Sequence, residues 1–128
     1  MTETLTATLK VLRRQIQVAF LADTAAPGSG WVDTMPSTGH CAIVAMLMRR
    51  MFGGEFVSAM PGGISHWFNR IELLGTSIDI DITGDQFGRP RVQVAPAGEL
   101  YTGTRGRLEA HINEDTIRRF ELFSSRIP

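Results

Sequence analysis

The chain has 128 residues, of which 43% are apolar and 20% are charged, and its 13 basic residues are balanced by 13 acidic ones. This length and composition are typical of one globular domain with a buried core, so residues 1–128 are expected to form a single domain and not a disordered chain. The formal net charge of zero gives no support for binding nucleic acid or an anionic membrane through bulk charge.

Cysteine usage and hydropathy narrow the class of protein further. The single cysteine, Cys41, cannot form an internal disulfide or a dithiol redox pair. No basic N-terminal segment with a small-residue cleavage site is visible, and no run of about 18 apolar residues is present. We therefore expect a cytoplasmic protein without a membrane span. It is expected to be a monomer, or a weak homodimer that associates through its N-terminal helix.

The first half of the chain predicts two helices separated by a loop. In residues 3–21, large apolar side chains recur every three or four positions and basic residues fall on the other face, which indicates an amphipathic helix. Pro27-Gly28 belongs to the loop that follows. A second helix is expected to begin near residue 38 and to end at Gly53-Gly54. Because residues 42–48 are apolar on nearly every side, we predict that this helix is buried on most faces.

The second half of the chain predicts an antiparallel sheet and a closing helix. Residues 55–60 are expected to form a strand, and residues 66–73 and 77–83 to form a hairpin joined by a short turn. A further strand is expected at residues 91–95, within a segment rich in glycine and proline. Asn113 is predicted to cap the last helix, which has acidic residues in its first turn.

The arginine-rich stretch from residue 105 to residue 119 is interpreted as a solvated face. Its arginines alternate with acidic residues, which is not the pattern of a phosphate-binding patch. Taken together, the predicted elements give an α+β fold. A buried helix that carries the cysteine packs on an antiparallel sheet and is flanked by the N- and C-terminal helices.

Cys41 lies at the start of the predicted buried helix, directly after Gly39-His40. The thiolate and not the thiol attacks a carbonyl carbon, and a helix N-terminus and a neighbouring imidazolium both favour the thiolate. The free N–H groups of the first helical turn are also suited to stabilise an oxyanion. His66 opens a predicted strand after the helix, so we expect it to supply the imidazole that activates Cys41.

The predicted hairpin supplies a carboxylate to orient the His66 ring. If Glu72 pairs with Ser77, His66 lies opposite Thr83 and diagonal to Asp81, with the two functional side chains on one face. This register makes Asp81 the favoured third catalytic residue.

Two other residues of the hairpin remain candidates for this role. Asp79 lies on the same strand as Asp81, but the same register places it two pairs further from His66. A register slip of one residue would instead bring Asn69 opposite Asp81. The sequence therefore favours Asp81 by reach and leaves Asp79 and Asn69 open.

Four segments of the chain resemble the YunG-like family of small bacterial proteins, within roughly residues 31–88 and with a fainter match in the last helix. They are Gly39-His40-Cys41-Ala42-Ile43-Val44, Phe52-Gly53-Gly54-Glu55, His66-Trp67-Phe68-Asn69-Arg70 and Asp81-Ile82-Thr83-Gly84-Asp85-Gln86-Phe87. More distantly, these features are similar to the transglutaminase core and to papain-like hydrolases. The resemblance implies a papain-like core with Cys41 as nucleophile, His66 as base and Asp81 as the residue that orients the base.

One position departs from the family pattern, which usually has Gly-Gln-Cys where this chain has Gly39-His40-Cys41. A glutamine there can donate a hydrogen bond to an oxyanion, whereas His40 can do so only with a suitable proton and rotamer. We expect the backbone N–H of Cys41 to serve as a donor, with His40 beside it. Five residues are predicted to contact the substrate: His40, Trp31, Trp67, Asn69 and Gln86.

The sequence predicts a cysteine hydrolase or acyl transferase that acts on an amide or ester of a small molecule or peptide through a thioester intermediate. The alternative is a catalytically inactive papain-like module that binds a peptide or protein partner, which the histidine at position 40 favours. No cofactor is expected. A zinc site made of His40, Cys41 and His66 is disfavoured, because adjacent residues rarely ligate one ion with good geometry, so no metal is expected either.

Overall fold

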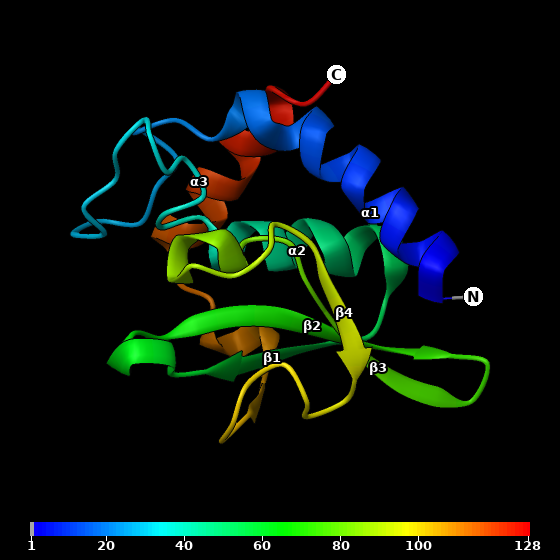
Figure 1. The fold of residues 1–128 in the computed structure, drawn as a ribbon. Helices are drawn as coiled ribbons and strands as arrows, with labels where there is room; N and C mark the ends of the chain where they lie inside the picture. Colours follow the sequence, from blue (N-terminus) through cyan, green and yellow to red (C-terminus); the bar gives the residue numbers. More distant parts are fainter. Residues whose placement is uncertain (1) are drawn as a thin grey trace.

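The computed structural model describes residues 2–128, which form three α-helices and a five-stranded antiparallel sheet (Figure 1). The helices are α1 (Thr2–Ile16), α2 (Cys41–Phe52) and α3 (Glu114–Ser125). The strands are β1 (Glu55–Ala59), β2 (His66–Leu73), β3 (Thr76–Asp81), β4 (Gln93–Pro96) and β5 (Arg105–Arg107), arranged in the order β4-β3-β2-β1-β5. The predicted α+β class is confirmed.

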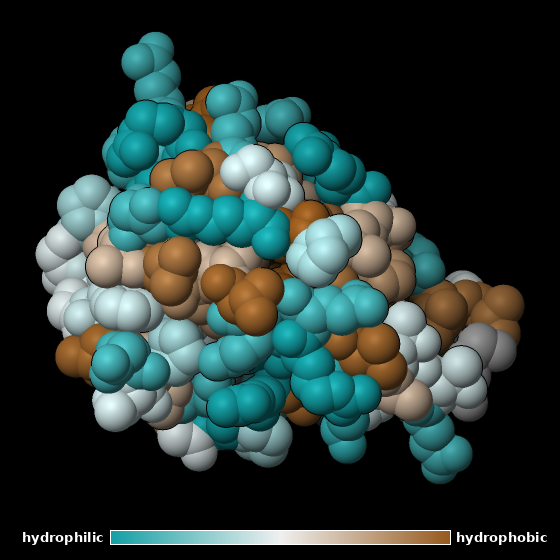
Figure 2. Space-filling model, turned by 90° about the horizontal axis from the view of Figure 1, so that it is seen from above, coloured by the Kyte–Doolittle hydropathy of each residue, from teal (hydrophilic) through white to brown (hydrophobic). Residues whose placement is uncertain are grey.

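The helix α2 lies between the sheet and the other two helices (Figure 1). Its apolar side chains meet those of α1, α3 and one face of the sheet in a single core, where burial of each large side chain contributes about 1.5–3 kcal/mol. On the outer face over α1 and α3, hydrophilic side chains are interspersed with apolar ones (Figure 2). The core includes Leu9, Leu12, Ile16, Ile43, Val44, Met48, Ile71, Ile78, Ile80 and Phe123. Across residues 2–128, the helices are all too short or too polar to cross a membrane.

Two helix ends differ from the sequence prediction for local backbone reasons. The α-helix α1 stops at Ile16 and continues only as a 3₁₀ turn, because Phe20 already has extended backbone angles (φ −80°, ψ 91°). The helix α2 begins at Cys41 and not near residue 38. Gly39 has φ +78°, and a Cβ there would lie 2.5 Å from Ser29 Oγ, so this position requires glycine and cannot be helical.

The hairpin register predicted from the sequence is confirmed. Glu72 pairs with Ser77 in the β2–β3 ladder, and the same register continues to the pair of Asn69 with Ile80. Side chains alternate between the two faces of a strand, so this register decides which residues of the hairpin meet the core helix. The same alternation determines on which face of the sheet the His66 side chain lies.

The strand β5 lies in the stretch that the sequence indicated to be only a solvated face. Arg105 and Gly106 are exposed and Arg107 is half-buried, as expected of a solvated face, but the backbone of these residues also pairs with β1 through Phe56, Val57 and Ser58. Arg107 Nε also donates to Ser58 Oγ at 2.8 Å. The strand β5 has only three residues and pairs through its backbone. The pattern of side chains in the sequence therefore did not indicate a strand.

The second face of the sheet carries a smaller core that is covered by the segment after β4. Val57, Ala59 and Phe68 on this face pack against Tyr101. The strand alternation places His66 on the same face as Phe68, two residues along β2. His66, at the start of β2, therefore lies on the face of the sheet that the segment around Tyr101 covers.

Candidate active site

His66 and Asp81 form a buried hydrogen-bonded pair at the start of β2 and the end of β3. His66 Nε2 and Asp81 Oδ2 are 2.8 Å apart, and the two side chains are 0% and 1% exposed. Asp79, the other candidate on this strand, pairs instead with Arg70 through Arg70 Nε and Asp79 Oδ1 at 2.7 Å. The geometry thus connects His66 with Asp81 and gives Asp79 a separate role in the sheet.

The Asp81 carboxylate accepts hydrogen bonds from several other donors. The Tyr101 hydroxyl and the Gln93 amide, at 3.3 Å, donate to Oδ2, while the backbone N–H of Thr83 donates to Oδ1 at 3.0 Å. Burial raises the pKa of Asp81, but the hydrogen bond and charge of His66, assisted by Tyr101 and Thr83, hold it below its usual range. The carboxylate is therefore charged at neutral pH.

Sequence reasoning missed Tyr101 and Gln93 as members of this site. Both lie far along the chain from His66, and no local spacing marks them. Gly84 is a third missed position, because a Cβ there would lie 2.5 Å from Gln93 Nε2 and 3.0 Å from Asp81 Oδ2. A glycine at this position leaves room for the polar cluster to close around the carboxylate.

The His66 ring is held in its charged form. Burial lowers the pKa of His66, but the hydrogen bond to Asp81, the neighbouring Cys41 thiol and the charges of both groups raise it to about 9. Since Asp81 occupies Nε2, Nδ1 is the ring atom left for the thiol, and no atom of residues 2–128 meets it with full hydrogen-bond geometry. Three aromatic rings surround the imidazole, with centroids 4.8, 5.4 and 6.0 Å away: Phe87, Tyr101 and Phe68.

Cys41 is the first residue of α2 and is half-buried on the wall of a cavity of about 350 Å³. His40, the residue before it, makes no side-chain hydrogen bond to the first turn of the helix, so the N–H groups there are not capped by that side chain. The thiol therefore shares the cavity with the start of a helix, where negative charge is stabilised. The other walls come from the loop at 26–29, Ile64, Ser65, Gln86, Phe87 and Arg119.

His40 does not face this cavity, contrary to the expectation that it contacts the substrate. Its ring is fully buried between Phe20 and Phe123, with centroids 4.8 and 6.1 Å away. Burial lowers the pKa of His40 to about 4, so the ring is neutral. Nδ1 donates to the Thr38 carbonyl at 3.0 Å, and Nε2 then accepts from the Thr24 hydroxyl at 2.8 Å. Neither ring nitrogen is left for an oxyanion.

Two of the predicted substrate contacts come from loops. Gln86 does line the cavity, and its amide donates to the Thr83 carbonyl at 2.9 Å. Trp31 is half-buried away from the cavity lining, where its Nε1 donates to the Pro36 carbonyl at 3.0 Å. Gln86 therefore lines the same cavity as the thiol, whereas Trp31 stabilises its own loop.

The two predicted contacts on β2 point away from the cavity, because they alternate with His66 along the strand. Asn69 is buried and donates from Nδ2 to the Ala45 carbonyl at 2.9 Å, which fastens β2 to α2. Trp67 packs on Phe56 with ring centroids 5.5 Å apart. Neither residue lines the cavity, and Asn69 is not the partner of Asp81. Among residues 2–128, no three His, Cys, Asp or Glu side chains are grouped so that they would hold a metal ion.

Comparison with known proteins gives the family. The family model described as "YunG protein" matches residues 8–127. The chain belongs to the YunG family. A relative from Bacillus subtilis (strain 168), described as "Uncharacterized protein YunG", is 26% identical over 99 residues, which cover 75% of this chain and 83% of the relative. No solved structure matches this YunG-family chain.

Proposed function

We propose that this protein is a papain-like cysteine hydrolase or acyl transferase that acts on an amide or ester. The observation that carries the proposal is the half-buried Cys41 thiol on a cavity wall, next to an imidazole that a buried carboxylate orients. Cys41 lines the cavity, while His66 and Asp81 are buried outside its lining, which suits a base and its orienting group.

The charge of His66 indicates how the reaction begins. Because the imidazole is protonated at neutral pH, its charge is proposed to stabilise the thiolate form of Cys41 that attacks the substrate. The thiolate attacks the carbonyl carbon, a C–S bond forms, and the carbonyl electron pair moves to oxygen. Backbone N–H groups at the start of α2 are suited to stabilise this oxyanion, a role that His40 cannot fill from the core.

The second half of the reaction returns the proton to His66. The imidazolium gives its proton to the leaving amine or alcohol as the C–N or C–O bond breaks, which leaves a thioester on Cys41. The neutral imidazole then takes a proton from water or an acceptor amine, which attacks the thioester and releases the thiolate. Asp81 holds the ring orientation throughout and stabilises its charged form.

The shape of the cavity limits the substrate to a small group. A volume of about 350 Å³ is at the small end of ligand pockets, so it suits a small molecule or one or two residues of a peptide. Its walls combine apolar surface from Ile64 and Phe87 with the polar groups of Gln86 and Arg119. We propose a small-molecule or short peptide acyl group as the part of the substrate that enters.

The second candidate is a catalytically inactive papain-like module that binds a peptide or protein partner. One observation favours it: the two longest polar side chains of the cavity are already engaged. Gln86 donates to the Thr83 carbonyl, and Arg119 donates to Asp115 and to the Thr24 carbonyl. In that case the cavity binds its ligand without forming a covalent bond to Cys41.

Trapping the acyl-enzyme separates the two candidates. The protein is incubated with p-nitrophenyl acetate and with short N-acyl amino-acid esters, quenched in acid and analysed by intact-mass spectrometry. A hydrolase shows an acyl mass on Cys41 that is lost in Cys41→Ala and strongly reduced in His66→Ala, while the exposed histidine variant His111→Ala keeps it. Equal acylation of the wild type and His66→Ala would contradict the proposed base. Binding of a peptide without any adduct would favour the second candidate.

A further inference from the structure

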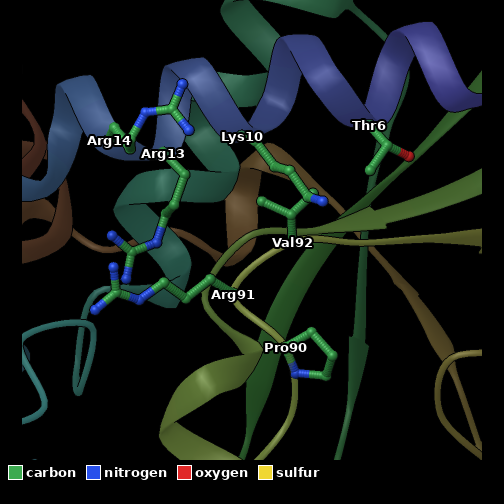
Figure 3. A pocket seen from close by; sticks show the side chains of 7 residues that line it. All are labelled: Thr6, Lys10, Arg13, Arg14, Pro90, Arg91 and Val92. Atoms are coloured by element: carbon green, nitrogen blue, oxygen red, sulfur yellow. The ribbon is translucent and has the colours of Figure 1, made fainter.

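A second cavity, of about 400 Å³, lies between α1 and the loop before β4 (Figure 3). Four of its side chains come from successive turns of α1, and Arg91 approaches from the opposite side. Figure 3 shows the guanidinium groups of Arg13 and Arg91 side by side. The lining includes four basic side chains and one hydroxyl: Lys10, Arg13, Arg14, Arg91 and Thr6.

The base of this cavity holds more positive than negative charge. Arg13 is buried, donating from Nε to the Ile82 carbonyl at 2.9 Å and from Nη2 to Asp85 Oδ2 at 3.1 Å. Arg91 Nε lies 3.9 Å from the same carboxylate oxygen, so one carboxylate serves two guanidinium groups. Asp85 also accepts a hydrogen bond from Ser37 Oγ at 2.7 Å. Burial lowers the pKa of Arg13. The negative charge of Asp85 raises this pKa in part, and the positive charge of Arg91 lowers it further.

The rim of the cavity adds two further cations. Lys10 and Arg14 are both exposed, and neither lies within 4.0 Å of a carboxylate among residues 2–128. Arg14 lies in the last turn of α1, where the helix dipole stabilises a positive charge. The helix dipole does not explain the positions of Lys10 and Arg91, which lie outside that turn. The whole chain has no net charge, so the excess is a local feature.

We propose that this basic cavity binds a small molecule carrying an oxyanion of at least two negative charges, such as a phosphate monoester or pyrophosphate group. Arg91 is 61% exposed and has only a long contact with Asp85, so its planar guanidinium is available for two parallel hydrogen bonds to such a group. Lys10 supplies a positive charge on a flexible side chain, and Arg13, held by its hydrogen bond to the Ile82 carbonyl, supplies a fixed positive charge at the floor of the cavity. A polycarboxylate has the same recognition chemistry. The site is separate from the Cys41 cavity and does not depend on the proposed reaction.

Titration calorimetry at low ionic strength tests the proposal with pyrophosphate in one arm and citrate in the other. The wild type is expected to bind pyrophosphate, and Lys10→Gln/Arg91→Gln to bind it at least about tenfold more weakly, the loss of one to two charge-assisted contacts. Arg105→Gln removes one exposed charge elsewhere and is expected to bind like the wild type. Tighter binding of pyrophosphate supports a phosphate ligand, and tighter binding of citrate supports a carboxylate ligand of the same kind.

Amide chemical shifts locate the bound anion and distinguish this basic cavity from the Cys41 cavity. Shifts are expected at residues 6–14, 91 and 92 but not at residues 26, 28 and 29, and Cys41→Ala is expected to bind unchanged. Because Lys10 and Arg91 are exposed, their variant should keep the wild-type melting temperature, which thermal unfolding checks. The proposal is overturned if neither anion binds, if the double variant binds like the wild type, or if the shifts map to another surface.

Discussion

The charge of His66 gives the most direct test of the candidate site. Its pKa is raised from an ordinary value of 6.5 to about 9, and at about 1.4 kcal/mol per tenfold change this corresponds to roughly 3 kcal/mol. A histidine with a raised folded-state pKa stabilises the fold fully below its unfolded pKa, and this contribution is lost as the pH rises. We therefore expect the free energy of unfolding to fall by roughly 3 kcal/mol between pH 6.5 and 9.

Urea denaturation at pH steps from 6 to 10 measures this loss, and the difference from His66→Gln isolates it from other titrating groups. NMR titration of the imidazole protons gives the pKa of His66 directly. In Asp81→Asn the pKa of His66 should fall well below 9, because burial lowers this pKa and the Asp81 charge that raises it has been removed. The matched variant Asp79→Asn removes a carboxylate that is bonded to Arg70 and should leave the titration near pH 9. A His66 that titrates near 6.5 in the wild type would show that Asp81 does not hold the ring in its charged form.

Three further predictions address the thiol and its supports. At pH 7, iodoacetamide should alkylate Cys41 at least about tenfold more slowly in His66→Ala than in the wild type, as followed by mass spectrometry, and equal rates would argue against activation of the thiol by His66. Gly84→Ala should lower the free energy of unfolding by about 1–3 kcal/mol because its Cβ meets the polar cluster, whereas Gly106→Ala, with no atom within 4 Å, should cost less. Tyr101→Phe should cost about 1–3 kcal/mol in urea denaturation by removing a donor to a buried carboxylate, and an unchanged midpoint would contradict that role.

Local patterns in the sequence were sufficient to place the central pair. The period of two along the hairpin and its short turn set the register of Glu72 with Ser77, and this register brings His66 to Asp81. The position of Cys41 at the start of α2 followed from glycine before an apolar run. These predictions depend on residues that are close in the chain, where spacing alone determines geometry.

Contacts between distant segments could not be predicted in this way. The ring of His40 is buried because Phe20 and Phe123, from opposite ends of the chain, enclose it. Tyr101 and Gln93 reach Asp81 only after the segment around β4 folds over the second face of the sheet. A single sequence carries no spacing rule for such contacts, so these residues became visible only in three dimensions.

The aromatic cover of His66 has a consequence for how protons move through the site. Phe87, Tyr101 and Phe68 surround an imidazole that has no solvent exposure. Bulk water therefore has no direct route to the ring, and a proton can pass only through Asp81 or through a group that stands in the Cys41 cavity. In the proposed reaction, the occupant of that cavity then controls both proton transfers, since the molecule that accepts the proton must also leave before the next proton can arrive.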